Sequence, residues 1–271
     1  MSNPLLNDKA LNDAARAGWG APEGASRSTP LGPMTDGPVS GWQATSNTMT
    51  VGGTATATGV LLVLLLSTAT IGWIVTVSTL KTSTQFPAMA IVAMLVGFGC
   101  AVFLHFKPTL AKIVAPIYAL AQGFFLGVIS AFYNKQYQGI VVQAVGATLA
   151  VFAVMLFLYK TRIIKVTDRF RRNVIMASMG LFMFYGVSLL LSLFGVRVPF
   201  INDASPLGIL FSVVAAGLAT MMLAVDFDQI ERGAKAGWPK GMEWYCAFGL
   251  LATLIWLYLE ILRLLAKLNR R

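Results

Sequence analysis

The sequence predicts an all-α membrane protein, a bundle of seven transmembrane helices preceded by a disordered N-terminal tail. Apolar residues make up 56% of the 271 residues and charged residues only 12%. An average soluble protein carries about 25% charged residues, and a soluble domain of this size cannot hide so much apolar side chain in one core. The third observation is the layout, because the apolar residues gather in seven long runs.

The first 54 residues differ in composition from the rest of the chain. They are rich in Gly, Ser, Thr, Pro, Asn and Asp and show little apolar periodicity. Such a segment buries too little apolar surface to offset the conformational entropy lost on ordering. We therefore expect residues 1–54 to form a disordered tail and residues 55–268 to form the transmembrane domain.

From Gly59 onward, seven apolar runs are long enough to cross a ~30 Å hydrocarbon core, which takes about 20 helical residues. The first six contain no Asp, Glu, Lys or Arg, and the segments between the first four are too short for a soluble domain. Unbroken runs exclude a β-barrel, which shows alternation in segments of about ten residues. The expected spans are Gly59–Ser78, Phe86–Phe106, Ile113–Phe132, Ile140–Tyr159, Val174–Phe194, Pro206–Val225 and Trp244–Leu265.

Basic residues in the connections orient the predicted bundle, because Lys and Arg concentrate in cytoplasmic loops. One side carries eleven of them and the other six, which places the N-terminus in the cytoplasm and the C-terminus outside the cell (plasma or inner) membrane. A re-entrant last segment would instead leave both ends inside. The eleven are Lys107, Lys112, Lys160, Arg162, Lys165, Arg169, Arg171, Arg172, Arg232, Lys235 and Lys240, and the six are Lys81, Lys135, Arg197, Lys267, Arg270 and Arg271.

Composition also excludes several function classes. The net charge of +10 comes from residues at the ends of the apolar runs rather than from one soluble module, which argues against nucleic-acid binding. Two cysteines exclude a disulfide scaffold and a Cys-rich metal site, and the single His105 excludes a three-histidine metal site. We expect no enzymatic activity, no cofactor and no permanently bound metal.

Small and polar residues inside the spans indicate close helix packing. Gly123-Phe-Phe-Leu-Gly127 has the spacing at which membrane helices approach each other closely. We expect this contact within the monomer, with a weak dimer as the alternative. Gln122 can hydrogen-bond across the bundle, and His105 at the end of the second span is expected to be an interfacial anchor.

Acidic residues at membrane depth are the most informative feature, because a charge there costs about 2.5–3.5 kcal/mol on insertion scales. Asp226 directly follows the sixth run, and Asp228 and Glu231 follow it at helical spacing from Arg232 and Lys235, with which they can pair. Glu260 is apolar-flanked on both sides and is the strongest functional candidate. Its expected structural partner is Arg263, one turn further on.

Three segments resemble the Bax inhibitor-1 (transmembrane Bax-inhibitor-motif) family. Residues 226–230 read Asp-Phe-Asp-Gln-Ile and are similar to the end of that family's sixth helix, and residues 257–260 read Leu-Tyr-Leu-Glu where the family has Leu-Tyr-Leu-acid in the seventh. Tyr118–Ser130 is similar to the third-helix signature, and residues 242–268 are similar to an actinobacterial branch. The resemblance covers about residues 55–268 and leaves the tail outside.

The resemblance implies a leak for calcium, with coupled protons, gated by one acid on the sixth helix and one on the seventh. The sixth-helix acid falls on Asp226, or on Asp228 if the match is shifted to Gln229, and the seventh-helix acid falls on Glu260. The sequence departs from the family pattern in two places. Gln122 stands where an acid is common, and the interval from Asp226 to Glu260, 34 residues, is longer than the family leads us to expect.

Two neighbouring carboxylates in a low-dielectric bundle resist joint ionisation, so the pair would hold one proton between them and bridge two helices. When both ionise, they repel each other and offer the hard oxygen ligands that calcium takes, so higher pH would favour the open state. Distance is the weak point. If the seventh helix starts at Trp244, Glu260 lies about 24 Å along it. Contact therefore requires the sixth helix to continue past Asp226 and the membrane-embedded part of the seventh to begin nearer Leu250.

Two functions stay open at this point. The first is a pH-sensitive calcium or cation leak channel or transporter gated by Asp226 and Glu260, with Asp228 as the alternative acid and with Arg263, His105 and Gln122 as accessory residues. The second is a non-conducting membrane stress or regulatory protein in which the acids are structural. The expected partners are the lipid bilayer, calcium and protons.

Overall fold

The computed structural model describes residues 48–79, 87–195 and 203–270, all within the compact unit Ala44–Arg271. In these ranges the chain forms seven long helices and no strand beyond an isolated bridge between Thr48 and Pro239. All seven are long and apolar enough to cross a membrane, which confirms the predicted fold class. The helices are α3 (Val51–Thr79), α4 (Ala88–Phe106), α5 (Ala111–Gln136), α6 (Ile140–Lys160), α7 (Asp168–Leu193), α9 (Pro206–Lys235) and α10 (Met242–Asn269), with a 3₁₀ turn, η2 (Pro108–Leu110), before α5.

Two helices extend well beyond the predicted spans. α3 begins at Val51 and therefore includes residues 51–54 of the predicted tail; the tail before residue 48 lies outside the described residues. In its first turns the hydroxyls of Thr54 and Thr58 donate to backbone carbonyls four residues earlier. α9 continues ten residues past Val225, because its polar end forms ion pairs one turn apart that keep the segment helical.

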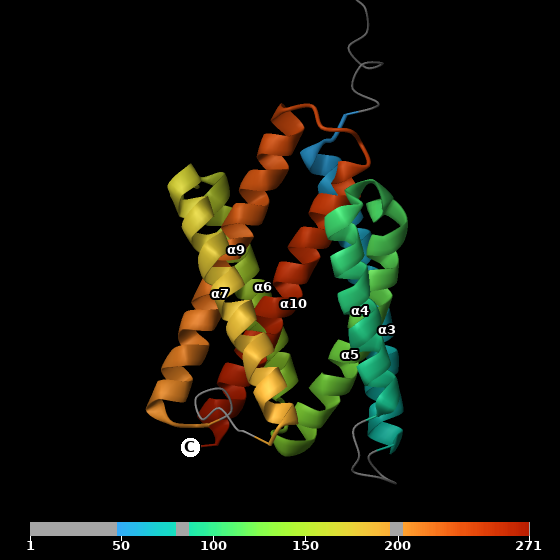
Figure 1. The fold of residues 1–271 in the computed structure, drawn as a ribbon, viewed down its shortest axis with the longest axis vertical. Coiled ribbons are helices and arrows are strands. Elements are labelled where there is room, and N and C mark those ends of the chain that lie inside the picture. The colour runs from blue at the N-terminus through green and yellow to red at the C-terminus, as the bar shows by residue number, and fades with distance from the viewer. Residues whose placement is uncertain (1–47, 80–86, 196–202, 271) are drawn as a thin grey trace, which may run out of the picture. The chain divides into compact units, whose positions relative to one another are not determined.

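Helix α10 forms the centre of the bundle. It lies between α7 and α9 on one side and α3, α4 and α5 on the other (Figure 1) and packs against α9, α3, α6 and α5. Leu251, Leu257 and Leu262 are among its fully buried side chains. Large apolar side chains such as Phe98 and Met183 are exposed on the outer helices, as expected where the bundle faces lipid rather than water.

Helices α3 and α5 pack most closely, through the predicted small-residue spacing. A Cβ atom at Gly123 would collide with the carbonyl oxygen of Leu65, and one at Gly127 with that of Ala69. Gly72 on α3 faces the backbone of Phe124 in the same way. The close contact expected of Gly123 and Gly127 is therefore made within the monomer.

The helices α3, α7 and α10 begin, and α6 and α9 end, at the top of the bundle in Figure 1. Basic residues are concentrated in these helix ends and in the link between α6 and α7. We call this the basic end. At the start of α7, the Thr167 side chain accepts a hydrogen bond from the backbone N–H of Phe170. The cations that define the basic end are Lys160, Arg162, Lys165, Arg232 and Lys235.

Candidate functional site

Asp226 lines a cavity of about 300 Å³ between α7, α9 and α10. Its Oδ2 atom is buried and has no hydrogen-bond partner among the described residues. Ser178 of α7 lines the same cavity, and its buried hydroxyl likewise has no partner among them. Buried polar atoms are nearly always satisfied in native proteins, so two unpartnered oxygens on one cavity mark a place for a proton, a water or a cation.

The cavity collects oxygen-bearing side chains. Besides Asp226 and Ser178 it is lined by Gln229 of α9 and by Tyr245 and Thr253 of α10. Carboxylate, amide carbonyl and hydroxyl oxygens are the ligands that hard cations take. The described residues hold no group of three or more His, Cys, Asp or Glu side chains placed to share a metal ion.

Glu260 lies in a different, fully partnered cluster. Its carboxylate is 1% exposed and accepts hydrogen bonds from Arg263 at 3.0 and 3.1 Å, an ion pair one turn apart that the sequence predicted. Tyr185 of α7 donates its hydroxyl to Glu260 at 2.9 Å, and the Arg263 guanidinium in turn donates to the Tyr185 oxygen and lies over its ring. The Trp256 indole donates at 3.2 Å.

The structure does not place Asp226 and Glu260 in contact. Asp226 lies beside Thr253, and Glu260 follows Thr253 by seven residues, or about 10 Å along α10. α9 does continue past Asp226, which was a condition for contact with Glu260. The residue of α10 that lies beside the Asp226 carboxylate, however, is Thr253 and not Glu260. Trp256 links the two places, because it lines the Asp226 cavity and also donates to Glu260.

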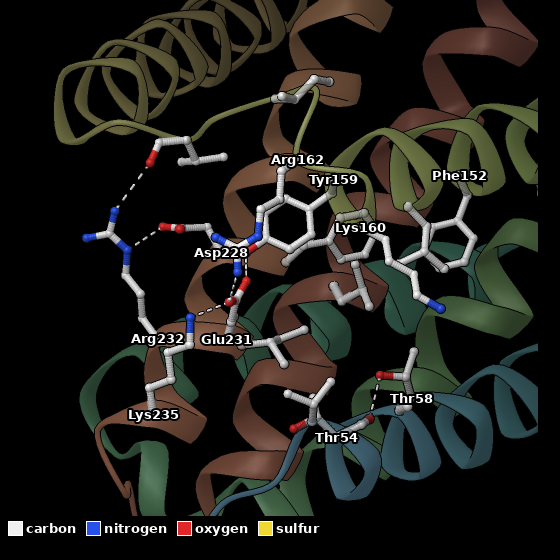
Figure 2. Close-up of a pocket in the computed structure, with 18 of the residues that line it drawn as sticks. Thr54, Thr58, Phe152, Tyr159, Lys160, Arg162, Asp228, Glu231, Arg232 and Lys235 are labelled. Carbon is white, nitrogen blue, oxygen red and sulfur yellow. Dashed lines mark hydrogen bonds and ion pairs between the residues drawn. The ribbon is translucent and has the colours of Figure 1, made fainter.

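Asp228 and Glu231 lie nearer the basic end and are both ion-paired. Asp228 forms an ion pair with Arg232 at 2.6 Å, and Glu231 forms one with Lys235, each pair one turn apart on α9 as the spacing predicted (Figure 2). Glu231 also accepts the hydroxyl of Tyr159 from α6. Both acids line a second, larger cavity and not the cavity of Asp226.

The remaining candidates lie away from these clusters. Gln122 of α5 packs against Gly97 of α4. His105 is exposed at the end of α4, where its ring meets Phe106 edge-on. Neither lines the Asp226 cavity, so an accessory role there has no geometric support.

Ser178, Tyr185, Tyr245, Thr253 and Trp256 are among the polar residues of the two clusters that were missed from the sequence. Hydroxyl-bearing residues are common in apolar helices, where most bond a carbonyl of their own helix, as Thr148 and Thr220 do. The only available signal for Ser178 and Tyr185 was their position in an otherwise apolar run, and that does not tell which neighbouring helix they face.

The comparisons with known proteins give one match. A protein-family model described as Bax inhibitor 1 like matches residues 3–270. No curated protein and no solved structure matches the chain significantly. The match begins at residue 3, which corrects the expectation that the resemblance starts near residue 55: the N-terminal segment belongs to the family pattern.

Proposed function

Because the chain belongs to the Bax inhibitor 1 like family, as the match over residues 3–270 shows, we propose that it is a pH-sensitive leak for calcium or another cation, with Asp226 as the ion-binding and proton-binding group. The observation that supports this most directly is the buried Oδ2 of Asp226, which faces a cavity without a described partner. A buried carboxylate oxygen without a partner is costly, and a proton or a bound cation would relieve that cost.

The proposed cycle uses only groups that line the cavity. With a proton on Asp226 the carboxyl is neutral and has no charge to attract a cation. Loss of that proton at higher pH leaves a carboxylate among the oxygens of Ser178, Gln229 and Thr253, which together form a hard-oxygen site. Higher pH should therefore favour cation entry. Calcium and protons are cargo in this proposal, and the protein needs no cofactor and is not an enzyme.

Glu260 takes a different role in this proposal from the one that the family resemblance implied. Its charge is balanced by Arg263, and Tyr185 and Trp256 both donate hydrogen bonds to its Oε1 atom. A carboxylate so held has little reason to release its partners for a passing ion. We propose that Glu260 fastens α7 to α10 beside the cavity, while Asp226 alone binds protons and cations.

A second function has its own support. If Asp226 never binds an ion, the partnered Glu260 cluster and the ion-paired acids of α9 would make this a non-conducting regulator whose acids serve only packing. Flux separates the two functions, because only the leak carries calcium in liposomes that contain no other protein.

The test is calcium flux into such liposomes across a pH series. Asp226→Asn should abolish the rise of flux with pH, since the amide cannot ionise. Glu260→Gln should keep the pH dependence in whatever protein folds, and Glu231→Gln, which changes an acid of the same helix outside the cavity, serves as the matched control. Wild-type protein without flux would favour the regulator, and an Asp226→Asn protein with the wild-type pH profile would reject the role of Asp226.

We also propose that the basic end faces the cytoplasm of a plasma or inner membrane, with the N-terminus on that side. Support comes from the eleven basic residues on this side of the bundle against six on the other. A cysteine introduced at Lys165 should resist membrane-impermeant thiol reagents added to intact cells. Labelling from outside would reverse the orientation.

A further inference from the structure

A cleft of about 1070 Å³ lies between α3, α6 and α9 near the basic end (Figure 2). α3 and α6 each pack against α9 and α10 but hardly touch each other. Leu250 of α10 lines the cleft from the centre of the bundle. Because the outer helices face the bilayer, a gap between two of them is open to a molecule that arrives from the lipid.

The inner part of the cleft is apolar. Leu62, Phe152 and Phe227 line it from α3, α6 and α9. Thr54 and Thr58 also line it, but their hydroxyls are bonded to carbonyls of their own helix. On α6, Phe152 lies eight residues before Lys160, or about 12 Å along the helix. On α9, Phe227 is directly followed by Asp228, whose charge is paired with Arg232.

The outer part of the cleft is positively charged. Five cations and two carboxylates line it, for a balance of 5 − 2 = +3. Asp228 and Glu231 are engaged with Arg232 and Lys235, whereas Lys160 and Lys165 form no ion pair with any described residue. The five cations are those that define the basic end.

From this arrangement we infer that the cleft binds one anionic phospholipid, with its phosphate between Lys160 and Lys165 and an acyl chain along Leu62, Phe152 and Phe227. The charge balance selects an anionic headgroup, and the apolar inner part selects a chain over a free anion. The inference does not depend on ion conduction, because none of the residues it uses lines the Asp226 cavity.

Native mass spectrometry of the full chain in detergent tests the inference, with phosphatidylglycerol and phosphatidylcholine of identical acyl chains as probes. We expect one phosphatidylglycerol retained in preference to phosphatidylcholine. Lys160→Gln combined with Lys165→Gln should weaken retention about 25-fold, since each lysine near an anionic headgroup contributes about fivefold. Lys107→Gln with Lys112→Gln removes the same charge from the link between α4 and α5, outside the cleft, and should change nothing.

A second pair of variants tests the acyl chain. A Cβ at Gly59 would meet open space, yet Gly59 lines the cleft, so Gly59→Leu fills the cleft without striking backbone. It should lower phosphatidylglycerol retention, while Gly146→Leu, at an open position on α6 outside the cleft, should not. Equal retention of both lipids, equal losses in the controls, or displacement of phosphatidylglycerol by glycerol phosphate would each overturn the inference.

Discussion

Replacing Glu260 with Gln should destabilise the protein strongly, because it leaves the Arg263 cation without its counter-charge. Tyr185 and Trp256 can still donate hydrogen bonds to the amide oxygen, so the loss is chiefly electrostatic. Removing one partner of a buried ion pair typically costs about 3–5 kcal/mol. Arg263 is 28% exposed and its charge is partly solvated, so we expect about 2–3 kcal/mol here.

A double-mutant cycle isolates the pair. Glu260→Gln with Arg263→Met removes both charges, so the double variant should recover part of the loss, with a coupling free energy of about 1–3 kcal/mol. Chemical unfolding in mixed micelles measures each free energy. Glu231→Gln breaks a pair whose side chains are 32% and 67% exposed and should cost only about 0–1 kcal/mol.

Two outcomes would refute this reasoning. If Glu260→Gln costs no more than Glu231→Gln, burial does not make the Glu260 pair special. If the losses of Glu260→Gln and Arg263→Met simply add, the two side chains do not depend on each other, and the contact at 3.0 Å contributes nothing measurable. Either result would also remove the reason for assigning Glu260 a structural role and Asp226 the ion-binding role.

The other predictions concern helix packing and the start of α3. Gly127→Ala should destabilise the protein by about 1–3 kcal/mol because its Cβ would strike the backbone of α3. Gly146→Ala, at an open position, should instead stabilise it by about 0.5–1 kcal/mol. Equal shifts in melting temperature for the two variants would contradict the close packing of α3 and α5. Glu243→Ala should lose about 1 kcal/mol and amide-exchange protection at residues 50–54, since Glu243 accepts hydrogen bonds from both the backbone N–H and the hydroxyl of Thr50 at 3.0 Å. Glu231→Ala, which removes a carboxylate that accepts no hydrogen bond from Thr50, should leave protection there unchanged.

The positions of the seven helices were predictable because a run of apolar residues is a one-dimensional signal. Ile140–Tyr159 and Phe86–Phe106 match α6 and α4 within two residues at either end. The extension of α9 beyond Val225 could not be predicted from hydropathy. Hydropathy falls at Asp226, whereas the helix continues through ion pairs such as that of Asp228 with Arg232. Membrane depth and helix length are different properties, and hydropathy reports only the first.

The candidate site was predictable only where partners lie close in sequence. Arg263 was expected beside Glu260 because residues three apart share a helix face. Asp226 faces Thr253, and Tyr185 faces Glu260, because of the way α7, α9 and α10 are rotated about their axes relative to one another. The spacing of residues along the sequence does not determine that rotation. The pair implied by family resemblance therefore became two separate clusters.

The contrast between the two acids yields an argument that ties stability to function. Glu260 is satisfied by three donors, so its removal should cost stability. Asp226 keeps a buried oxygen without a described partner, so its removal should cost little or even stabilise, as happens where activity requires an unfavourable group. Unfolding measurements on Asp226→Asn should show a free energy equal to or above that of the wild type, together with the loss of pH-dependent flux. A marked destabilisation would mean that Asp226 is a packing residue, and the proposed ion site would lose its foundation.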